Sequence, residues 1–272
     1  MLRPSALLPA LLACTAQGQV TECIAVDVDA SNWFFWRFEL RECETLNLNN
    51  HSLGVRGAIA LSQALKGNSN LRELKMERCG IGARGAAALL SVLGDSAINK
   101  LDLEANQIGA EGAASIAGSL SSTRLRELDL EQNELSDAGA AALAQALKGS
   151  PLTKLDLESN HIGDAGAIAL ARSLRRNRVM RELDLHGNVV GPKGLRALVN
   201  AVAVNRKIEK ISIPEPGPLL PVRARRYHAT LLRLLGKLVQ ANGRGANWRE
   251  KHLLRRRYQR RHKARRQGRR PM

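Results

Sequence analysis

A repeat of 27 or 28 residues runs through most of the chain and limits the folds that it can adopt. Each unit follows the pattern L-x-x-L-x-L-x-x-N-x-[IL]-[GS]-x-x-G, most clearly from Leu125 to Gly139. A period of this length indicates a solenoid, in which each unit packs mainly against its two neighbours. Seven units are present, and they begin at Cys43, Leu71, Ile98, Leu125, Leu152, Met180 and Ile208.

Two shorter periods lie inside each unit. Leu128 and Leu130 alternate with polar residues, which is typical of a strand with one face in water. After Gly139, Leu143 and Leu147 recur at helical spacing within an Ala-rich stretch, and alanine favours helix. Each unit therefore predicts one short strand and one helix. Stacked units would form a parallel sheet on the inner curve and a layer of helices on the outer one.

The unit length, the helix in every repeat and the glycine at each helix start resemble the ribonuclease-inhibitor class of leucine-rich repeats. This class includes the repeat domains of NOD-like receptors and of the Ran GTPase-activating protein. The resemblance covers residues 43–213 and implies an α/β fold, a leucine-rich repeat solenoid (horseshoe), with strands on the concave face and helices on the convex face. It also implies that the concave sheet binds a protein. The GTPase-activating function is not carried over, because an acidic C-terminus accompanies it and this chain ends in a basic tail.

The asparagine of the pattern is expected to be structural, since a buried amide needs hydrogen bonds to backbone groups. Cys79 takes its place in one unit, and Cys43 takes an apolar position. Both cysteines are predicted to be core residues, with redox or metal chemistry as the alternative. Asparagine itself occupies the position in four units, at Asn106, Asn133, Asn160 and Asn188, and His51 occupies it in the first.

The ends of the chain differ from the repeats. We expect the clustered aromatic residues 33–38 to cap the first unit, because a solenoid would otherwise expose an apolar face. The predicted divisions are 1–20, an N-terminal tail or a secretory signal; 21–42, an N-terminal cap; 43–213, the repeats; 214–222, a Pro-rich linker; and 223–272, a basic tail. Within that tail, residues 227–240 predict an amphipathic helix, either a closing cap or a helix for a membrane surface or a partner.

The net charge of +17 lies in the last fifth of the chain. From residue 219 onward there are 18 Lys and Arg and one acid, whereas residues 1–218 hold 24 of each sign. Such a tail predicts polyanion binding or a localisation signal. The residues expected to carry it are Arg255, Arg256, Arg257, Arg260, Arg261, Lys263, Arg265 and Arg266.

The sequence shows no known catalytic or metal-binding motif. The sequence contains no phosphate-binding loop, nucleophile elbow, H-E-x-x-H pair or C-x-x-C pair. His186, near Asp184 and Glu182, is predicted to be a solvated surface residue more readily than a base. We therefore expect a non-enzymatic protein without cofactor or metal.

The polar positions of the predicted strands form three columns. The first alternates in sign from Glu73 through Lys100 and Glu127 to Lys210, and it predicts a cross-strand charge ladder. The other two are mostly acidic. Across five strands the 15 positions hold 11 acids and 3 Lys, a net charge of −8. The second and third columns make the candidate protein-binding face: Lys75, Glu77, Asp102, Glu104, Asp129, Glu131, Asp156, Glu158, Asp184 and His186.

Three interpretations of this acidic face remain open: copied polar residues without a ligand, a bound basic protein segment, and a bound divalent ion or small molecule. The basic segment defines the leading hypothesis, a protein–protein interaction scaffold. The chain's own tail is a candidate plug for the face, so truncation at residue 222 is expected to raise affinity for basic ligands. The alternative is a nuclear or nucleolar adaptor whose Arg-rich tail binds RNA or DNA.

The compartment is expected to be cytoplasmic or nuclear. Cys43 and Cys79 are predicted to be buried, and unpaired thiols suit a reducing compartment. The alternative is secretion, if residues 1–16 are a signal peptide. No segment approaches the ~18 apolar residues needed to span a bilayer.

Overall fold

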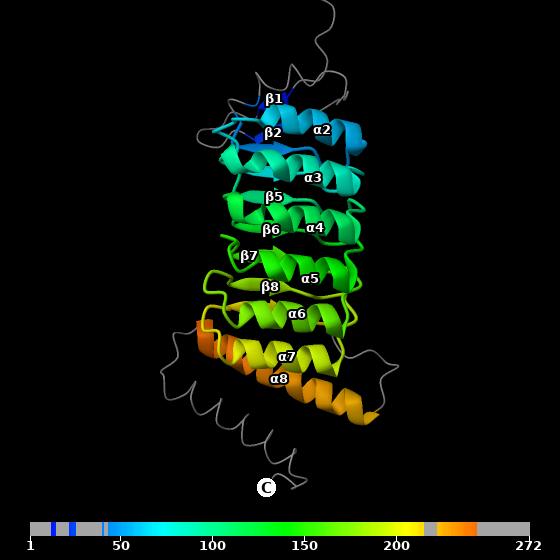
Figure 1. The fold of residues 1–272 in the computed structure, drawn as a ribbon, viewed down its shortest axis with the longest axis vertical. Helices are drawn as coiled ribbons and strands as arrows, with labels where there is room; N and C mark the ends of the chain where they lie inside the picture. The colour runs from blue at the N-terminus through cyan, green and yellow to red at the C-terminus, as the bar shows by residue number, and fades with distance from the viewer. Residues whose placement is uncertain (1–11, 15–21, 26–39, 41–42, 215–221, 244–272) are drawn as a thin grey trace, which may run out of the picture.

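The computed structural model describes residues 12–14, 22–25, 40, 43–214 and 222–243 (Figure 1). The strands in this part are β1 Leu12–Cys14, β2 Glu22–Ala25, β3 Thr45–Asn47, β4 Glu73–Lys75, β5 Lys100–Asp102, β6 Glu127–Asp129, β7 Lys154–Asp156, β8 Glu182–Asp184 and β9 Lys210–Ser212. The α-helices are α2 Gly54–Leu65, α3 Gly82–Val92, α4 Gly109–Ser119, α5 Ser136–Ala146, α6 Asp164–Leu174, α7 Pro192–Val202 and α8 Val222–Gly243. Short 3₁₀ turns, η2 Leu93–Asp95 and η3 Leu120–Ser122, extend α3 and α4.

The described strands form one sheet in chain order, from β1 to β9. Strands β2 to β9 are parallel, and β1 pairs antiparallel with β2. Helices α2 to α7 stack in a single layer against this sheet (Figure 1). The register places the middle leucines of successive strands opposite one another, as in Leu101 and Leu128. The predicted leucine-rich repeat solenoid, with seven repeat strands, is confirmed.

The core lies between the sheet and the helices, and each repeat supplies the same few side chains to it. Leu128 and Leu130 from β6 and its exit, with Leu143 from α5, are at most 1% exposed. The repeat glycine allows the helices to approach closely. A Cβ at Gly85 would lie 2.9 Å from the Cβ of Ala58 on the preceding helix. The glycine at this position of the repeat therefore serves packing between neighbouring helices.

The repeat asparagines form a buried ladder that ties each unit to the previous one. Asn133 is fully buried; its Nδ2 donates to the carbonyls of Leu103 (2.8 Å) and Glu131 (2.9 Å). Its Oδ1 accepts from the backbone N–H of Asn106 (3.0 Å) and Ile108 (3.3 Å). The same pattern recurs at Asn106 and Asn160. The amide side chains are structural, as the sequence predicts.

The cysteines depart in part from the prediction. Cys79 is a buried free thiol, and its Sγ lies 3.0 Å from the carbonyl oxygen of Leu48, so it keeps one of the asparagine contacts. Burial raises the pKa of this thiol to about 11, which makes it a poor nucleophile. Cys43 is also buried, but it forms a disulfide with Cys23. The expectation of an unpaired thiol is confirmed for Cys79 and wrong for Cys43, because the pairing of β2 with β3 brings Cys23 beside the first repeat.

The two ends of the solenoid are covered differently. Helix α8 packs against α7 at the C-terminal end (Figure 1), and its residues Leu231, Leu235 and Leu238 are buried there. At the other end β1, from the segment predicted to be a tail or signal, pairs with β2 beside the first repeat. The aromatic cluster 33–38 and most of the Pro-rich linker lie outside the described residues. In the part that the structure describes, no helix combines the length and apolar character that crossing a bilayer requires.

Candidate protein-binding face

The ten residues predicted to bind a protein follow the concave sheet in two columns. Register pairing places Lys75, Asp102, Asp129, Asp156 and Asp184 opposite one another on β4 to β8. The third column, from Glu77 to His186, follows two residues after each of these positions. Neighbouring strands lie ~4.8 Å apart, so the four aspartates form a continuous row. We call Asp102, Asp129, Asp156 and Asp184 the aspartate row.

Each member of the aspartate row has a structural contact of its own. The Oδ1 atom of Asp129 accepts a hydrogen bond from the backbone N–H of Glu131 at 2.9 Å, and Asp156 does the same for Glu158 at 3.0 Å. Asp102 and Asp184 repeat this turn. Such side-chain-to-backbone bonds are typical of Asp and Asn at the exit of a strand. The sequence analysis missed this role because it considered the aspartates only as charges facing a ligand.

Burial and mutual repulsion disturb the ionisation of three members of the row, Asp102, Asp129 and Asp156. Burial raises the pKa of Asp129 to about 7, and the like charges of Asp156 and Asp102 add to this rise, against the hydrogen bond from Glu131. Burial also raises the pKa of Asp102 and of Asp156, with like charges from their neighbours contributing. A desolvated acid beside other acids resists ionisation. The ionisation of the central aspartates therefore depends strongly on any nearby cation.

The third column is partly neutralised by its own neighbours. Arg78 forms ion pairs with Glu77 and with Glu104, the latter at 3.4 Å. Gln132 Nε2 donates to Glu131 Oε1 at 2.9 Å. Arg78 therefore offsets part of the charge of Glu77 and Glu104, whereas the neutral amide of Gln132 leaves the charge of Glu131 in place.

His186 closes the third column and is exposed, as predicted. Its Nδ1 lies 3.0 Å from Glu158 Oε1 on the neighbouring repeat, and this hydrogen bond, with the glutamate's charge, raises the pKa of the imidazole. The predicted neighbours in sequence were Asp184 and Glu182. The contact that matters comes instead from Glu158, one repeat earlier.

The first column has the register that the alternating signs predict. Glu73, Lys100 and Glu127 lie opposite one another on β4 to β6. The Lys100 and Glu127 side chains approach to 3.5 Å with about half their surfaces exposed, so this pair contributes at most ~1 kcal/mol. Among the described residues, no other neighbouring Glu and Lys of this column bring their charged atoms within 4 Å of each other. A depression of about 160 Å³ lies between this column and the aspartate row, over Leu101 and Leu128.

Three carboxylates converge at one end of the face. Asp156, Glu158 and Asp184 each offer an oxygen, and these oxygens lie within 4.8 Å of one another. Exposed acids gather in this way with or without a metal, so the cluster adds to the negative potential and defines no metal site. The predicted polyanion-binding residues, from Arg255 to Arg266, lie outside the described part of the chain.

Comparisons with known proteins agree with the fold. Five segments match the family described as Leucine Rich repeat: residues 67–90, 98–117, 121–144, 150–171 and 176–199. A comparison with curated protein sequences gave no match. The solenoid is thus built of leucine-rich repeats, and the segments that match are those with the clearest repeat pattern.

Two solved structures are similar to this chain to different degrees. One, titled Leiomodin-1 Actin-Binding Site 2 (ABS2), is 22% identical, with a TM-score of 0.51 over 64% of this chain and 96% of that chain. Another, from structural genomics of Caenorhabditis elegans, is a tropomodulin C-terminal domain; it is 20% identical, with a TM-score of 0.38 over 50% of this chain and 82% of that chain. At 22% identity the likeness to the first structure concerns the fold alone.

Proposed function

We propose that this protein is a non-catalytic scaffold of the ribonuclease-inhibitor class, which binds a basic protein segment through its acidic concave face. Lys or Arg side chains of the segment lie along the aspartate row, with Glu104, Glu131 and Glu158 at its border. The binding surface is shallow and extended, which suits a strand or loop of a protein better than a compact small molecule.

The observation that carries this proposal concerns the residue at the aspartate-row position in the first repeat. There Asn47 occupies the position of the aspartate row, and its Oδ1 accepts a hydrogen bond from the N–H of Asn49 at 3.1 Å. An uncharged oxygen acceptor therefore suffices for this turn, and a charge is not required. After Lys75 in the second repeat, four successive aspartates nevertheless follow, at a cost in burial and repulsion that the raised pKa of Asp129 reflects. A cationic ligand offsets that cost.

The comparisons support a protein partner in general terms. Leucine-rich repeats form extended concave surfaces, and one structure of similar fold is titled an actin-binding site. This likeness is one of fold, and the identity of the partner here rests on charge alone.

Binding of a peptide with the sequence of residues 255–266 tests the proposal. The triple variant Asp102→Asn/Asp129→Asn/Asp156→Asn keeps the turn acceptors and removes three charges, so affinity should fall at least about tenfold. A control, Asp95→Asn/Glu111→Gln/Glu134→Gln, removes three exposed acids elsewhere and should stay within about twofold. Equal affinities of the two variants would reject the concave face as the binding surface.

Autoinhibition by the basic tail is the finer part of the proposal. Truncation at residue 222 is the wrong test, because it removes α8, which covers α7. A chain ending at Gly243 keeps this helix and lacks the Arg-rich segment. It should bind the 255–266 peptide more tightly than the full chain does at low salt. Unchanged affinity would exclude the plug.

A nucleic-acid adaptor is the second candidate, and the observation that favours it is the confinement of all +17 charges to the tail. RNA binding that depends steeply on salt and disappears in the chain ending at Gly243 would support it. Retention of a protein partner by that truncated chain would support the scaffold instead.

The Cys23–Cys43 disulfide bears on the compartment. Disulfides persist in oxidising compartments, so this bond supports the secreted alternative over the cytoplasmic or nuclear one. Mass spectrometry of the mature protein tests it. A new N-terminus near residue 16 and a linked Cys23–Cys43 peptide would support secretion, whereas an intact N-terminus with two free thiols would support the intracellular location.

A further inference from the structure

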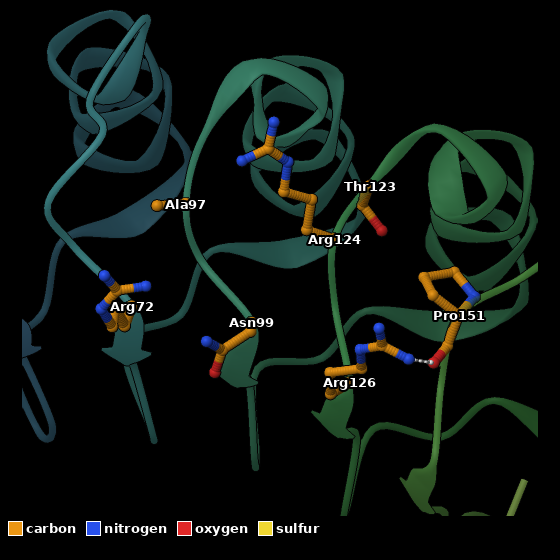
Figure 2. A pocket seen from close by; sticks show the side chains of 7 residues that line it. All are labelled: Arg72, Ala97, Asn99, Thr123, Arg124, Arg126 and Pro151. Atoms are coloured by element: carbon orange, nitrogen blue, oxygen red, sulfur yellow. Dashed lines mark hydrogen bonds between the residues drawn. The ribbon is translucent and has the colours of Figure 1, made fainter. Parts of the chain in front are cut away.

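A second charged site lies at the opposite edge of the sheet from the acidic columns. The acidic columns lie at the ends of the strands, whereas this pocket opens where the chain enters them. Arg72, Asn99 and Arg126 immediately precede β4, β5 and β6. The pocket has a volume of about 370 Å³ and is shown in Figure 2. It is lined by Arg72, Ala97, Asn99, Thr123, Arg124, Arg126 and Pro151.

Three guanidinium groups lie around this pocket without an acid in its lining. Arg126 donates to the carbonyl of Pro151 at 3.3 Å (Figure 2). Within the part of the chain that the structure describes, the side chains of Arg72 and Arg124 make no hydrogen bond or ion pair. Glu44 lies opposite Arg72, at the entry to the neighbouring strand β3. Within the described residues it forms no ion pair with Arg72.

The residues that immediately precede each strand form a row across the sheet, and one arginine of this row is neutralised by an acid. Arg181, at the entry to β8, pairs with Glu209 at the entry to β9. In the row that borders the pocket, Arg126 lies between Asn99 and Thr153, which are uncharged. Arg72 lies between Asn99 and Glu44, and Glu44 forms no ion pair with it in the described part of the chain. The concentration of positive charge is therefore specific to this part of the edge.

The floor of the pocket is polar and held in place. Thr123 is 6% exposed, and its hydroxyl donates to the carbonyl of Leu120 at 3.0 Å. Asn99 is half-buried, and its backbone N–H is fixed by the carbonyl of Arg72 at 2.8 Å. The amide of Asn99 supplies a further N–H donor beside the arginines (Figure 2).

We propose that this pocket binds a phosphate group. Arginine presents a planar fork of N–H donors that matches phosphate oxygens, often in pairs of hydrogen bonds. A phosphate monoester carries about −1.5 to −2 charges near neutral pH, so it balances several guanidinium groups where a single carboxylate does not. The ligand is either a free phosphate compound or a phosphorylated side chain of a partner protein. This site is separate from the acidic face and does not depend on the function proposed for that face.

Calorimetric titration of the full-length chain at physiological ionic strength tests this inference. One probe is pyrophosphate; the other is a short Gly/Ser peptide with one phosphoserine, compared with its unphosphorylated form. The basic tail contributes weak polyanion binding to every variant, so the comparison is between variants that keep the tail. The pocket variant is Arg72→Gln/Arg124→Gln/Arg126→Gln, and the matched control is Arg172→Gln/Arg175→Gln/Arg178→Gln, three exposed arginines elsewhere.

Loss of charge-assisted hydrogen bonds should weaken binding at least about tenfold in the pocket variant and less than about twofold in the control. Arg126→Lys keeps the charge but loses the planar fork, so it should weaken binding several-fold with the fold intact. Tighter binding of pyrophosphate indicates a free compound, and tighter binding of the phosphopeptide indicates a partner protein. Equal affinity of the pocket and control variants, or binding of neither probe, would overturn the proposal.

Discussion

Asp129 has two roles with opposite requirements. Its Oδ1 must accept the hydrogen bond from Glu131, which either Asp or Asn provides, as Asn47 does in the first repeat. Its charge lies among other acids in a partly buried position, which raises its pKa to about 7. The folded chain therefore holds this proton more tightly than the unfolded chain does. Its contribution to stability is present below the ordinary pKa of 3.8 and is lost as the pH rises to about 7.

Asp129→Asn should therefore stabilise the protein at high pH. The free energy of unfolding at pH 8 should rise by about 1–2 kcal/mol, a value reduced for partial exposure, and the gain should shrink towards pH 4. Urea unfolding at several pH values measures it. Glu134→Gln, an exposed acid outside the row, is the control. A gain that is the same at both ends of this pH range would contradict the assignment.

Asn133 shows how much a single buried amide can contribute. Asn133→Ala would leave two N–H groups and two carbonyls without these partners in the interior. We expect a loss of about 3 kcal/mol or more in the free energy of unfolding. The exposed neighbour Gln132→Ala should cost less than about 0.5 kcal/mol. Similar melting temperatures for the two variants would mean that the ladder is not structural.

At the scale of elements, α8 determines whether the last repeat is protected. Three of its leucines are buried, and Asn242 Nδ2 donates to the carbonyls of Asn205 (3.1 Å) and Ile208 (2.9 Å). A chain ending at residue 221 should melt at a lower temperature and aggregate, because the apolar side of α7 becomes exposed. A chain ending at Gly243 should melt like the full-length protein. Light scattering and thermal melts measure both, and equal behaviour of the two truncations would show that α8 is no cap.

The disulfide has the corresponding role at the first repeat. Cys23 and Cys43 close a loop of about 20 residues that joins β2 to the repeats. Reduction should lower the free energy of unfolding by about 3 kcal/mol and speed amide exchange in β3 before it affects β6. Exchange that is equal with and without reductant would show that the bond does not anchor this end.

At the scale of the whole molecule, the period of the sequence predicts most of the fold. Strand register, inward leucines and the Asn ladder repeat every 27 or 28 residues. The structure predicted for one unit is therefore supported by the same pattern in the others. The Cys23–Cys43 bond could not be predicted in this way, since it joins the first repeat to a segment outside the period. The arginine pocket was also missed, because Arg72 and Arg126 hold the same position in two repeats, and the sequence does not show that Arg124 lies beside them.

The sequence predicts only part of the charge distribution on the sheet. The acidic columns were visible in the sequence, because strand residues two apart point to the same side. Their partial neutralisation by Arg78 was not, since this side chain lies in a turn and reaches across to the next repeat. The molecule presents acids at one edge of the sheet and arginines at the other.

The central claim is that the aspartate row is charged at a cost that a basic partner relieves. Carbon NMR titration of the Asp129 carboxyl measures this directly, with and without the 255–266 peptide bound to the chain ending at Gly243. We predict a pKa near 7 in the free chain, and a clearly lower one in the complex. An Asp129 pKa that the bound peptide leaves unchanged would contradict the account.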